Sequence, residues 1–347
     1  MNSRIDNVMK ATYLLRKSLE EGNRHFVYTE DVGREYVKVF NYVNSDIKLM
    51  EFAKDSFGMT SDCYILYAIG HLGMAERNTI LLFLSAIAHK NPALNIANLD
   101  RGRLIDRLRV LNSMGLIFKH RYEVTEPAAE GGGNDTVALY SLTEDAFNLV
   151  KQRLQKRLII NSAIQMKPIK ELIGWACAGF VGTYIAVNAA GFVEYLDRVL
   201  RTKQIGTVYF PCEMKIQKDG GLYYVAVFNA YMGMDASYQT KSDYADMCAL
   251  KVNTIRNYLN CRTQKGKAIA VIAVSDNADL NEIAGCIYKS GVMEEFYDRI
   301  YYTGEGIVKS EVLEGLNVSA GERFLRMQED AESEKGYSIL QCMVPFL

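Results

Sequence analysis

Residues 100–125 read DRGRLIDRLRVLNSMGLIFKHRYEVT, and residues 136–143 read TVALYSLT. In the longer stretch, leucines recur at helical spacing up to Gly115, and apolar and polar residues then alternate as they do in strands. Three consecutive glycines, residues 131–133, lie in the polar segment between the two alternating arms. The sequence therefore predicts a helix that is followed directly by a β-hairpin.

Further helices are predicted on both sides of this segment. Residues 61–72 and 75–90 are rich in apolar residues and carry the cap and stop signals of two helices. Thr143 opens another helix after the hairpin. Three helices, a hairpin and a helix form the order of a winged helix-turn-helix, which binds duplex DNA with its third helix in the major groove. We therefore predict a winged helix-turn-helix domain at residues 59–158.

The third helix and the first hairpin arm form the densest basic window of the chain, with six Lys or Arg residues against one acid, Asp106. Arg103 and Val110 fall opposite the leucine face of the helix, and Arg107 lies on its flank. Arginines in this setting reach phosphates and guanine edges. A solvated helix face, or a module that docks a protein, would carry the same charges. The candidate DNA-binding residues are Arg101, Arg103, Arg107, Arg109, Lys119 and Arg121, with His120 as a further phosphate contact.

Composition narrows the classes of function. The net charge is −1, so affinity for nucleic acid must come from a local patch. Seven cysteines without a C-x-x-C pair, and only four histidines, argue against a zinc site and for reduced thiols in a cytoplasm. The charged start of the chain predicts no signal peptide. Residues 172–196 approach the length of a membrane span, but Asn188, Glu194 and scattered glycines predict a packed helix instead.

Residues 168–305 predict a mixed α/β domain. Helical sequence at 169–201 precedes a hairpin at 205–230, and helices then alternate with apolar strands. Residues 1–58 are predicted to be an extension that packs on the winged helix. Residues 306–347 are predicted to be a C-terminal tail with an apolar strand at its end, and both terminal segments are candidate dimer contacts. The predicted fold class is thus α/β (α+β).

A helix, a hairpin, a helix and a strand are also the core order of PD-(D/E)xK nucleases. In these enzymes carboxylates at adjacent strand ends hold Mg²⁺, and a lysine orients the attacking water. The one E-x-K in a predicted strand is Glu213-Met214-Lys215, and Glu194 or Asp197 is a candidate further ligand. Glu and Lys two residues apart on a strand point to the same side, so a surface pair is the simpler explanation. Mg²⁺ is expected only if the nuclease chemistry holds; otherwise we expect no metal and no cofactor.

The chain as a whole resembles the plasmid replication-relaxation family over residues 60–305. The residues that carry the resemblance are YIAVN at 184–188, PC at 211–212, YYVAVFN at 223–229 and RIYYT at 299–303. The resemblance implies a nuclease-like fold and a role in plasmid replication or conjugative transfer. The family's acidic residues are absent from the second and third of these motifs. The resemblance therefore implies a degenerate, catalytically inactive nuclease-like domain.

Three functions remain open from the sequence. The first is a non-catalytic DNA-binding protein of a plasmid or integrative mobile element, with relaxase or replication proteins as partners. The second is a Mg²⁺-dependent nuclease that uses Glu213 and Lys215. The third is a transcriptional regulator whose α/β domain binds a partner. In each case we expect a cytoplasmic protein that does not bind membranes, and a homodimer is compatible with all three.

Overall fold

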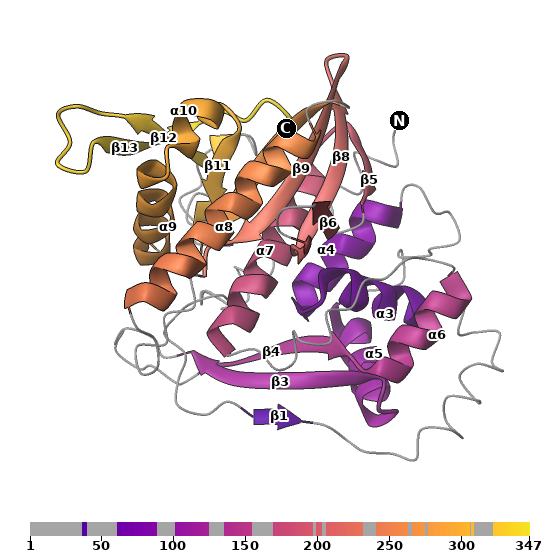
Figure 1. Ribbon diagram of the computed structural model, residues 1–347. Helices are drawn as coiled ribbons and strands as arrows, with labels where there is room; N and C mark the ends of the chain where they lie inside the picture. The colour runs from indigo at the N-terminus through magenta and orange to yellow at the C-terminus, as the bar shows by residue number, and fades with distance from the viewer. Residues whose placement is uncertain are drawn as a thin grey trace. The chain divides into compact units, whose positions relative to one another are not determined.

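A computed structural model describes residues 37–39, 61–88, 101–124, 135–154, 169–196, 199–202, 206–231, 241–262, 266–274, 277–305, 307–308 and 322–347. These residues form a mixed α/β structure (Figure 1). The chain divides into two compact units, Met1–Leu172 and Ile173–Leu347. Most of the predicted N-terminal extension, the hairpin tip at 125–134 and Asp197 lie outside the described residues.

The first unit contains the predicted order of three helices, a hairpin and a helix. Its four-stranded sheet has the order β1-β3-β4-β2, and every neighbouring pair is antiparallel. The short strand β1 comes from the N-terminal extension, so this part of the extension packs on the hairpin as predicted. The elements are β1 (Val37–Val39), α3 (Ser61–Leu72), β2 (Ala75–Glu76), α4 (Arg77–Ala88), α5 (Arg101–Ser113), β3 (Ile117–Val124), β4 (Asp135–Leu142) and α6 (Glu144–Leu154).

Local sequence explains where these elements end. Gly73 has φ 77° and donates its N–H to the Ile69 carbonyl at 2.8 Å, so it closes α3 as the sequence predicts. Gly115 has φ 71° and closes α5 in the same left-handed conformation. Thr143 caps α6: its Oγ1 accepts the N–H of Ala146 at 3.3 Å and also donates to the carbonyl of residue 116. The cap therefore fixes α6 to the start of the hairpin.

The second unit is built on a seven-stranded sheet of order β13-β12-β11-β10-β9-β8-β5. The three strands β9, β10 and β11 are parallel, and the strands outside them are antiparallel. The elements are α7 (Ile169–Asn188), β5 (Phe192–Tyr195), β6 (Val199–Thr202), β7 (Gly206–Tyr209), β8 (Cys212–Lys218), β9 (Gly221–Asn229), α8 (Lys241–Arg262), β10 (Lys267–Ala273), α9 (Asn277–Lys289), α10 (Val292–Phe296), β11 (Ile300–Thr303), β12 (Phe324–Glu329) and β13 (Tyr337–Cys342).

Helices cover both faces of this sheet (Figure 1). The helix α7 packs against β8 and β9, because a Cβ added to Gly182 would lie only 2.6 Å from the Cys212 Sγ and 3.5 Å from Val227. On the other face, buried residues of α8 and α9 such as Ile255 and Ile283 share one core with alternate residues of β9 and β10. Among the described residues, no helix has the length and apolar character that a membrane crossing requires.

Two predictions for this unit were wrong in detail. The helical segment expected to reach residue 201 ends at Asn188, and β5 and β6 follow it. The single strand expected before the hairpin turn is divided into β7 and β8, with Pro211 between them. By contrast, the apolar strand expected at the end of the tail is present as β13, which pairs with β12, and β12 pairs with β11.

Candidate nucleic-acid interface

The exposed face of α5 is the one that the sequence predicts. Leu104, Leu108 and Leu111 are buried, whereas Arg103 and Arg109 are exposed on the other side of the helix. Val110 also lies on this outer side and is 38% exposed. The helix therefore presents two arginines, the Asp106 carboxylate and one apolar side chain to solvent. The side chain of Arg101, also predicted to contact DNA, lies outside the described residues.

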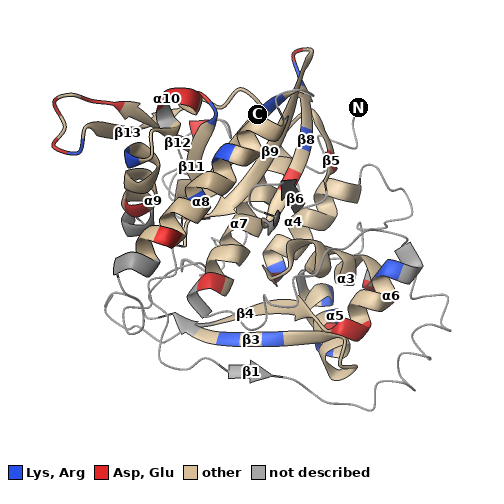
Figure 2. Ribbon diagram, in the orientation of Figure 1, with Lys and Arg blue, Asp and Glu red and all other residues tan. Residues whose placement is uncertain are grey.

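The hairpin continues this surface. On β3, His120 and Tyr122 are buried, whereas Lys119 is half-buried and Arg121 is exposed. Side chains alternate between the two faces of a strand, so Lys119 and Arg121 share the outer face. Figure 2 shows the basic residues on β3. His120, predicted as a phosphate contact, instead lies inside the unit with its Nε2 2.9 Å from the Ser141 Oγ.

The pKa of Lys119 shows which cations act on this part of the surface. Burial lowers the pKa of Lys119, and the positive charges of Arg121, Arg109 and Arg77 lower it further. All three charged neighbours that shift this pKa are thus arginines. We name these four residues, Arg77, Arg109, Lys119 and Arg121, the basic surface. It joins the start of α4, the exposed face of α5 and the outer face of β3.

Two carboxylates border the basic surface. Glu76 Oε1 lies 3.4 Å from Arg77 Nε, while Glu76 Oε2 accepts the backbone N–H of Asn78 at 2.6 Å at the start of α4. Asp106 Oδ1 lies 3.4 Å from Arg109 NH1, and both of these side chains are highly exposed. Each acid pairs with an arginine, and neither is among the groups that shift the Lys119 pKa. The surface therefore keeps a positive character.

The structure places Arg107 elsewhere. Its Nε donates to Asp62 Oδ1 at 2.8 Å, and its NH2 donates to Asp62 Oδ2. Asp62 is buried in the first turn of α3, and this hydrogen bonding raises the pKa of Arg107. A guanidinium and a carboxylate joined by two hydrogen bonds form a geometrically specific contact. Arg107 thus connects α5 to α3 inside the unit.

Sequence reasoning missed Arg77. It lies at the first position of α4, outside the basic window between Arg101 and Arg121. Only the fold brings Arg77 near Lys119. A charged residue next to the predicted start of the second helix was visible in the sequence, but nothing local connected it to the hairpin.

In the second unit, Glu213 and Lys215 both lie on β8. Glu213 is fully buried and its Cα partner is Ala226, which belongs to the core beneath α8. Lys215 is half-buried, with Glu194 as its partner on β5. Among the described residues, no group of three or more His, Cys, Asp or Glu side chains has an arrangement that would hold a metal ion. The predicted further ligand Asp197 is not among them.

A second polar cluster lies at the carboxyl end of β9. Lys251 of α8 donates from its Nζ to the Asn229 carbonyl at 2.7 Å, to Asn229 Oδ1 at 3.1 Å and to the Tyr231 carbonyl. Carboxyl ends of parallel strands are where α/β folds commonly bind ligands. Here the lysine occupies that end with contacts to the protein's own chain, so it fixes α8 to β9.

Comparison of the chain with protein-family models, with curated proteins and with solved structures found no match. The resemblance to the plasmid replication-relaxation family therefore stays a prediction.

Proposed function

We propose that the first unit is a winged helix-turn-helix domain that binds duplex DNA. The observation that carries the proposal is the basic surface, in which Lys119 is half-buried, Arg109 and Arg121 are exposed, and the charges of three arginines act on Lys119. Cations that repel one another weaken the folded state, and a polyanion such as DNA relieves that repulsion. Arg103, exposed on the same helix as Arg109, extends the surface along α5.

In this proposal α5 enters the major groove. Its 13 residues span about 20 Å, and its exposed face carries Arg103, Asp106 and Val110. Arginine recognises guanine, a carboxylate accepts from cytosine, and an apolar side chain contacts the thymine methyl group. Lys119 and Arg121 on β3 would then lie against phosphates beside the groove and set the position of the helix. Arg107 is not among the residues proposed to contact DNA, because its guanidinium is hydrogen-bonded to Asp62.

We propose that the second unit is a non-catalytic domain with a nuclease-like order of elements. The order α7, β5, β8, β9, α8, β10 supports the resemblance, with β6 and β7 inserted after β5. Glu213 is fully buried opposite the core residue Ala226, and this supports the absence of catalysis, because a catalytic metal has to be within reach of the substrate. A role in the replication or transfer of a mobile element, together with relaxase or replication proteins, belongs to the same proposal.

DNA binding is tested by fluorescence anisotropy with a labelled duplex at several salt concentrations between about 50 and 200 mM. The test variant is Lys119→Gln/Arg121→Gln. The matched control is Lys151→Gln/Lys289→Gln, which removes two exposed charges from α6 and α9. The test variant should weaken binding and reduce the slope of log K against log salt by about two, since each lost phosphate contact contributes ~0.9. The control should bind like the parent.

Equal binding by the parent and the Lys119→Gln/Arg121→Gln variant would overturn the assignment of this surface. A surface that docks an acidic protein would give a different pattern. The parent would then bind duplex no more tightly than the Lys119→Gln/Arg121→Gln variant does, with a shallow salt dependence for both.

A further inference from the structure

The second unit contains a pair of thiols that the proposed DNA binding does not use. Cys248 on α8 and Cys286 on α9 have their Sγ atoms 2.9 Å apart, which is closer than ordinary contact between two sulfur atoms. Both side chains are half-buried and both thiols are free. The Tyr244 hydroxyl lies 3.8 Å from the Cys286 Sγ and covers one side of the pair. Two helices thus hold these cysteines at close approach.

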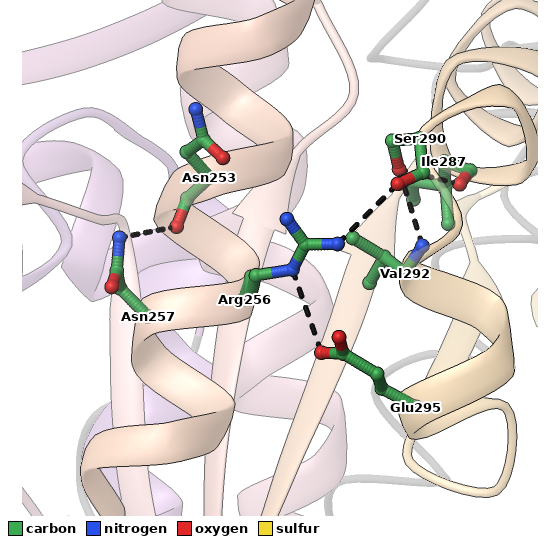
Figure 3. Close-up of polar contacts among 7 residues, drawn as sticks. All are labelled: Asn253, Arg256, Asn257, Ile287, Ser290, Val292 and Glu295. Atoms are coloured by element: carbon green, nitrogen blue, oxygen red, sulfur yellow. Dashed lines mark hydrogen bonds and ion pairs between the residues drawn. The ribbon is translucent and has the colours of Figure 1, made fainter.

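The backbone around the pair is fixed by packing and by polar contacts. Arg256 lies two turns after Cys248 on α8; its NH2 donates to the Ser290 carbonyl at 3.3 Å, and its Nε lies 3.5 Å from Glu295 Oε2 (Figure 3). Ser290 in turn donates its Oγ to the Ile287 carbonyl at 2.6 Å, at the end of α9. The contact between the helices therefore continues beyond the thiols, and the shared apolar core lies beneath both.

We propose that Cys248 and Cys286 are a redox-active pair, which a peroxide or a small-molecule disulfide oxidises to a reversible bond between α8 and α9. In cytoplasmic proteins, disulfides of this kind are transient and responsive to oxidants. The 2.9 Å approach of the two Sγ atoms places each thiol within reach of the other. Cys261, by contrast, is exposed near the end of α8.

The chemistry balances with hydrogen peroxide as oxidant. The Cys248 sulfur attacks one peroxide oxygen, an S–O bond forms, the O–O bond breaks, and the leaving hydroxide takes the thiol proton to become water. The Cys286 sulfur then attacks the sulfenic sulfur, so that the S–S bond forms and the S–O bond breaks. The second hydroxide leaves with the Cys286 proton as water. Two thiols and one peroxide thus give one disulfide and two waters, and the two electrons pass from the thiols to the peroxide.

The order of attack follows from the surroundings of Cys286. Burial, together with the neighbouring Cys248, raises the pKa of Cys286 to about 11, while the Tyr244 hydroxyl acts in the opposite direction. Cys286 is therefore protonated at neutral pH, and a protonated thiol is a poor initial nucleophile. The raised pKa of Cys286 favours Cys248 for the first attack and Cys286 for the resolving step.

The bond would stabilise the second unit. It closes a loop that contains the rest of α8, the strand β10 and the first part of α9. Loop closure of this length lowers the entropy of the unfolded chain. For a unit of this size the expected rise in the melting temperature is about 5–15 °C.

The test uses the full chain with the substitution Cys261→Ser, because the exposed Cys261 thiol could otherwise form a disulfide between two molecules. The protein is treated with hydrogen peroxide, the remaining thiols are alkylated, and the products are analysed by intact mass and by a non-reducing peptide map. The expected result is a loss of two hydrogens, one crosslinked peptide pair containing Cys248 and Cys286, reversal by dithiothreitol and a higher melting temperature. Adding Cys248→Ser should abolish the crosslink.

Alkylation of both Cys248 and Cys286 after the treatment would overturn the proposal, and so would a crosslink that joins either of them to another cysteine. These peptide maps use the parent sequence apart from residue 261, so the proposal remains testable if Cys248→Ser does not fold. DNA binding plays no part in the measurement, and its failure would leave this result unchanged.

Discussion

Replacing Arg107 by alanine should weaken the fold of the first unit without removing a DNA contact. The sequence assigns Arg107 to the DNA-binding set, but its guanidinium makes two hydrogen bonds to the Asp62 carboxylate. The Arg107 side chain is 42% exposed and that of Asp62 is 10% exposed. The substitution therefore leaves a largely buried carboxylate without its cation.

The size of the effect lies between two limits. A hydrogen bond to a charged group contributes about 1.5–3 kcal/mol when it is shielded from water. An exposed ion pair contributes only ~0.2–1 kcal/mol. Because Arg107 is open to solvent and Asp62 is not, we expect the free energy of unfolding to fall by about 1–2 kcal/mol. For a unit of this size the melting temperature should fall by about 2–8 °C.

The chain offers a way to assign the loss to one unit. Trp175 is the only tryptophan, and it lies in the second unit. Arg107→Ala should shift the transition seen by far-ultraviolet circular dichroism and leave the tryptophan fluorescence transition in place. In a double-mutant cycle with Asp62→Ala, the coupling energy should be at least ~0.5 kcal/mol. DNA affinity of the folded protein and its salt slope should stay at the parental values.

Arg109→Ala is the matched control, because Arg109 lies on the same helix and its partner Asp106 is exposed. It should leave stability within ~0.5 kcal/mol of the parent and weaken DNA binding. Arg107→Ala is thus expected to lower stability alone, and Arg109→Ala to lower DNA affinity alone. If Arg107→Ala instead keeps its stability and loses affinity and salt slope as Arg109→Ala does, then Arg107 reaches DNA and the contact with Asp62 has no structural role.

Three further variants test other contacts. Lys119→Met should weaken DNA binding yet raise the melting temperature by about 1–2 °C. The lowered pKa of Lys119 means that the folded state disfavours the protonated amine. This penalty is present at neutral pH and disappears as the pH rises through the lowered pKa towards 10.5. The parent and Lys119→Met should therefore have different melting temperatures at pH 7 and the same melting temperature above pH 10. Lys251→Met should lower the stability of the second unit by about 1–3 kcal/mol in denaturant melts followed by tryptophan fluorescence, because the acceptors on Asn229 and Tyr231 lose their donor. Neither the parent nor Glu213→Gln should nick supercoiled plasmid that is incubated with Mg²⁺. Nicking by the parent that disappears in this variant would restore the nuclease alternative.

The helix and hairpin of the first unit follow from sequence because their signals are local. Leucine spacing sets the buried face of α5, and the change of period at Gly115 coincides with the left-handed residue that ends it. Thr143 likewise caps the helix that it was expected to cap. Each of these features depends on residues within a few positions of one another.

The roles of individual cations do not follow from sequence in this way. Asp62 lies 45 positions before Arg107, so no window around α5 contains the partner that holds this arginine. Arg77 joins the basic surface from another helix. For the same reason the sequence does not reveal β12 or its pairing with β11, because that pairing joins residues far apart along the chain.

The position of β3 in its sheet explains how the first unit tolerates a concentration of positive charge. The strand β1 pairs with β3 at the two cationic positions, with Val39 opposite Lys119 and Val37 opposite Arg121, and β4 pairs along the other edge. Lys119 and Arg121 therefore stand on a backbone that has a neighbouring strand on both sides. A ligand that binds them does not have to order a loop, so less conformational entropy is lost on binding. In this arrangement β1 of the N-terminal extension supports the basic surface. The pairing of β3 with β1 and β4 holds Lys119 and Arg121 in place although their positive charges repel each other.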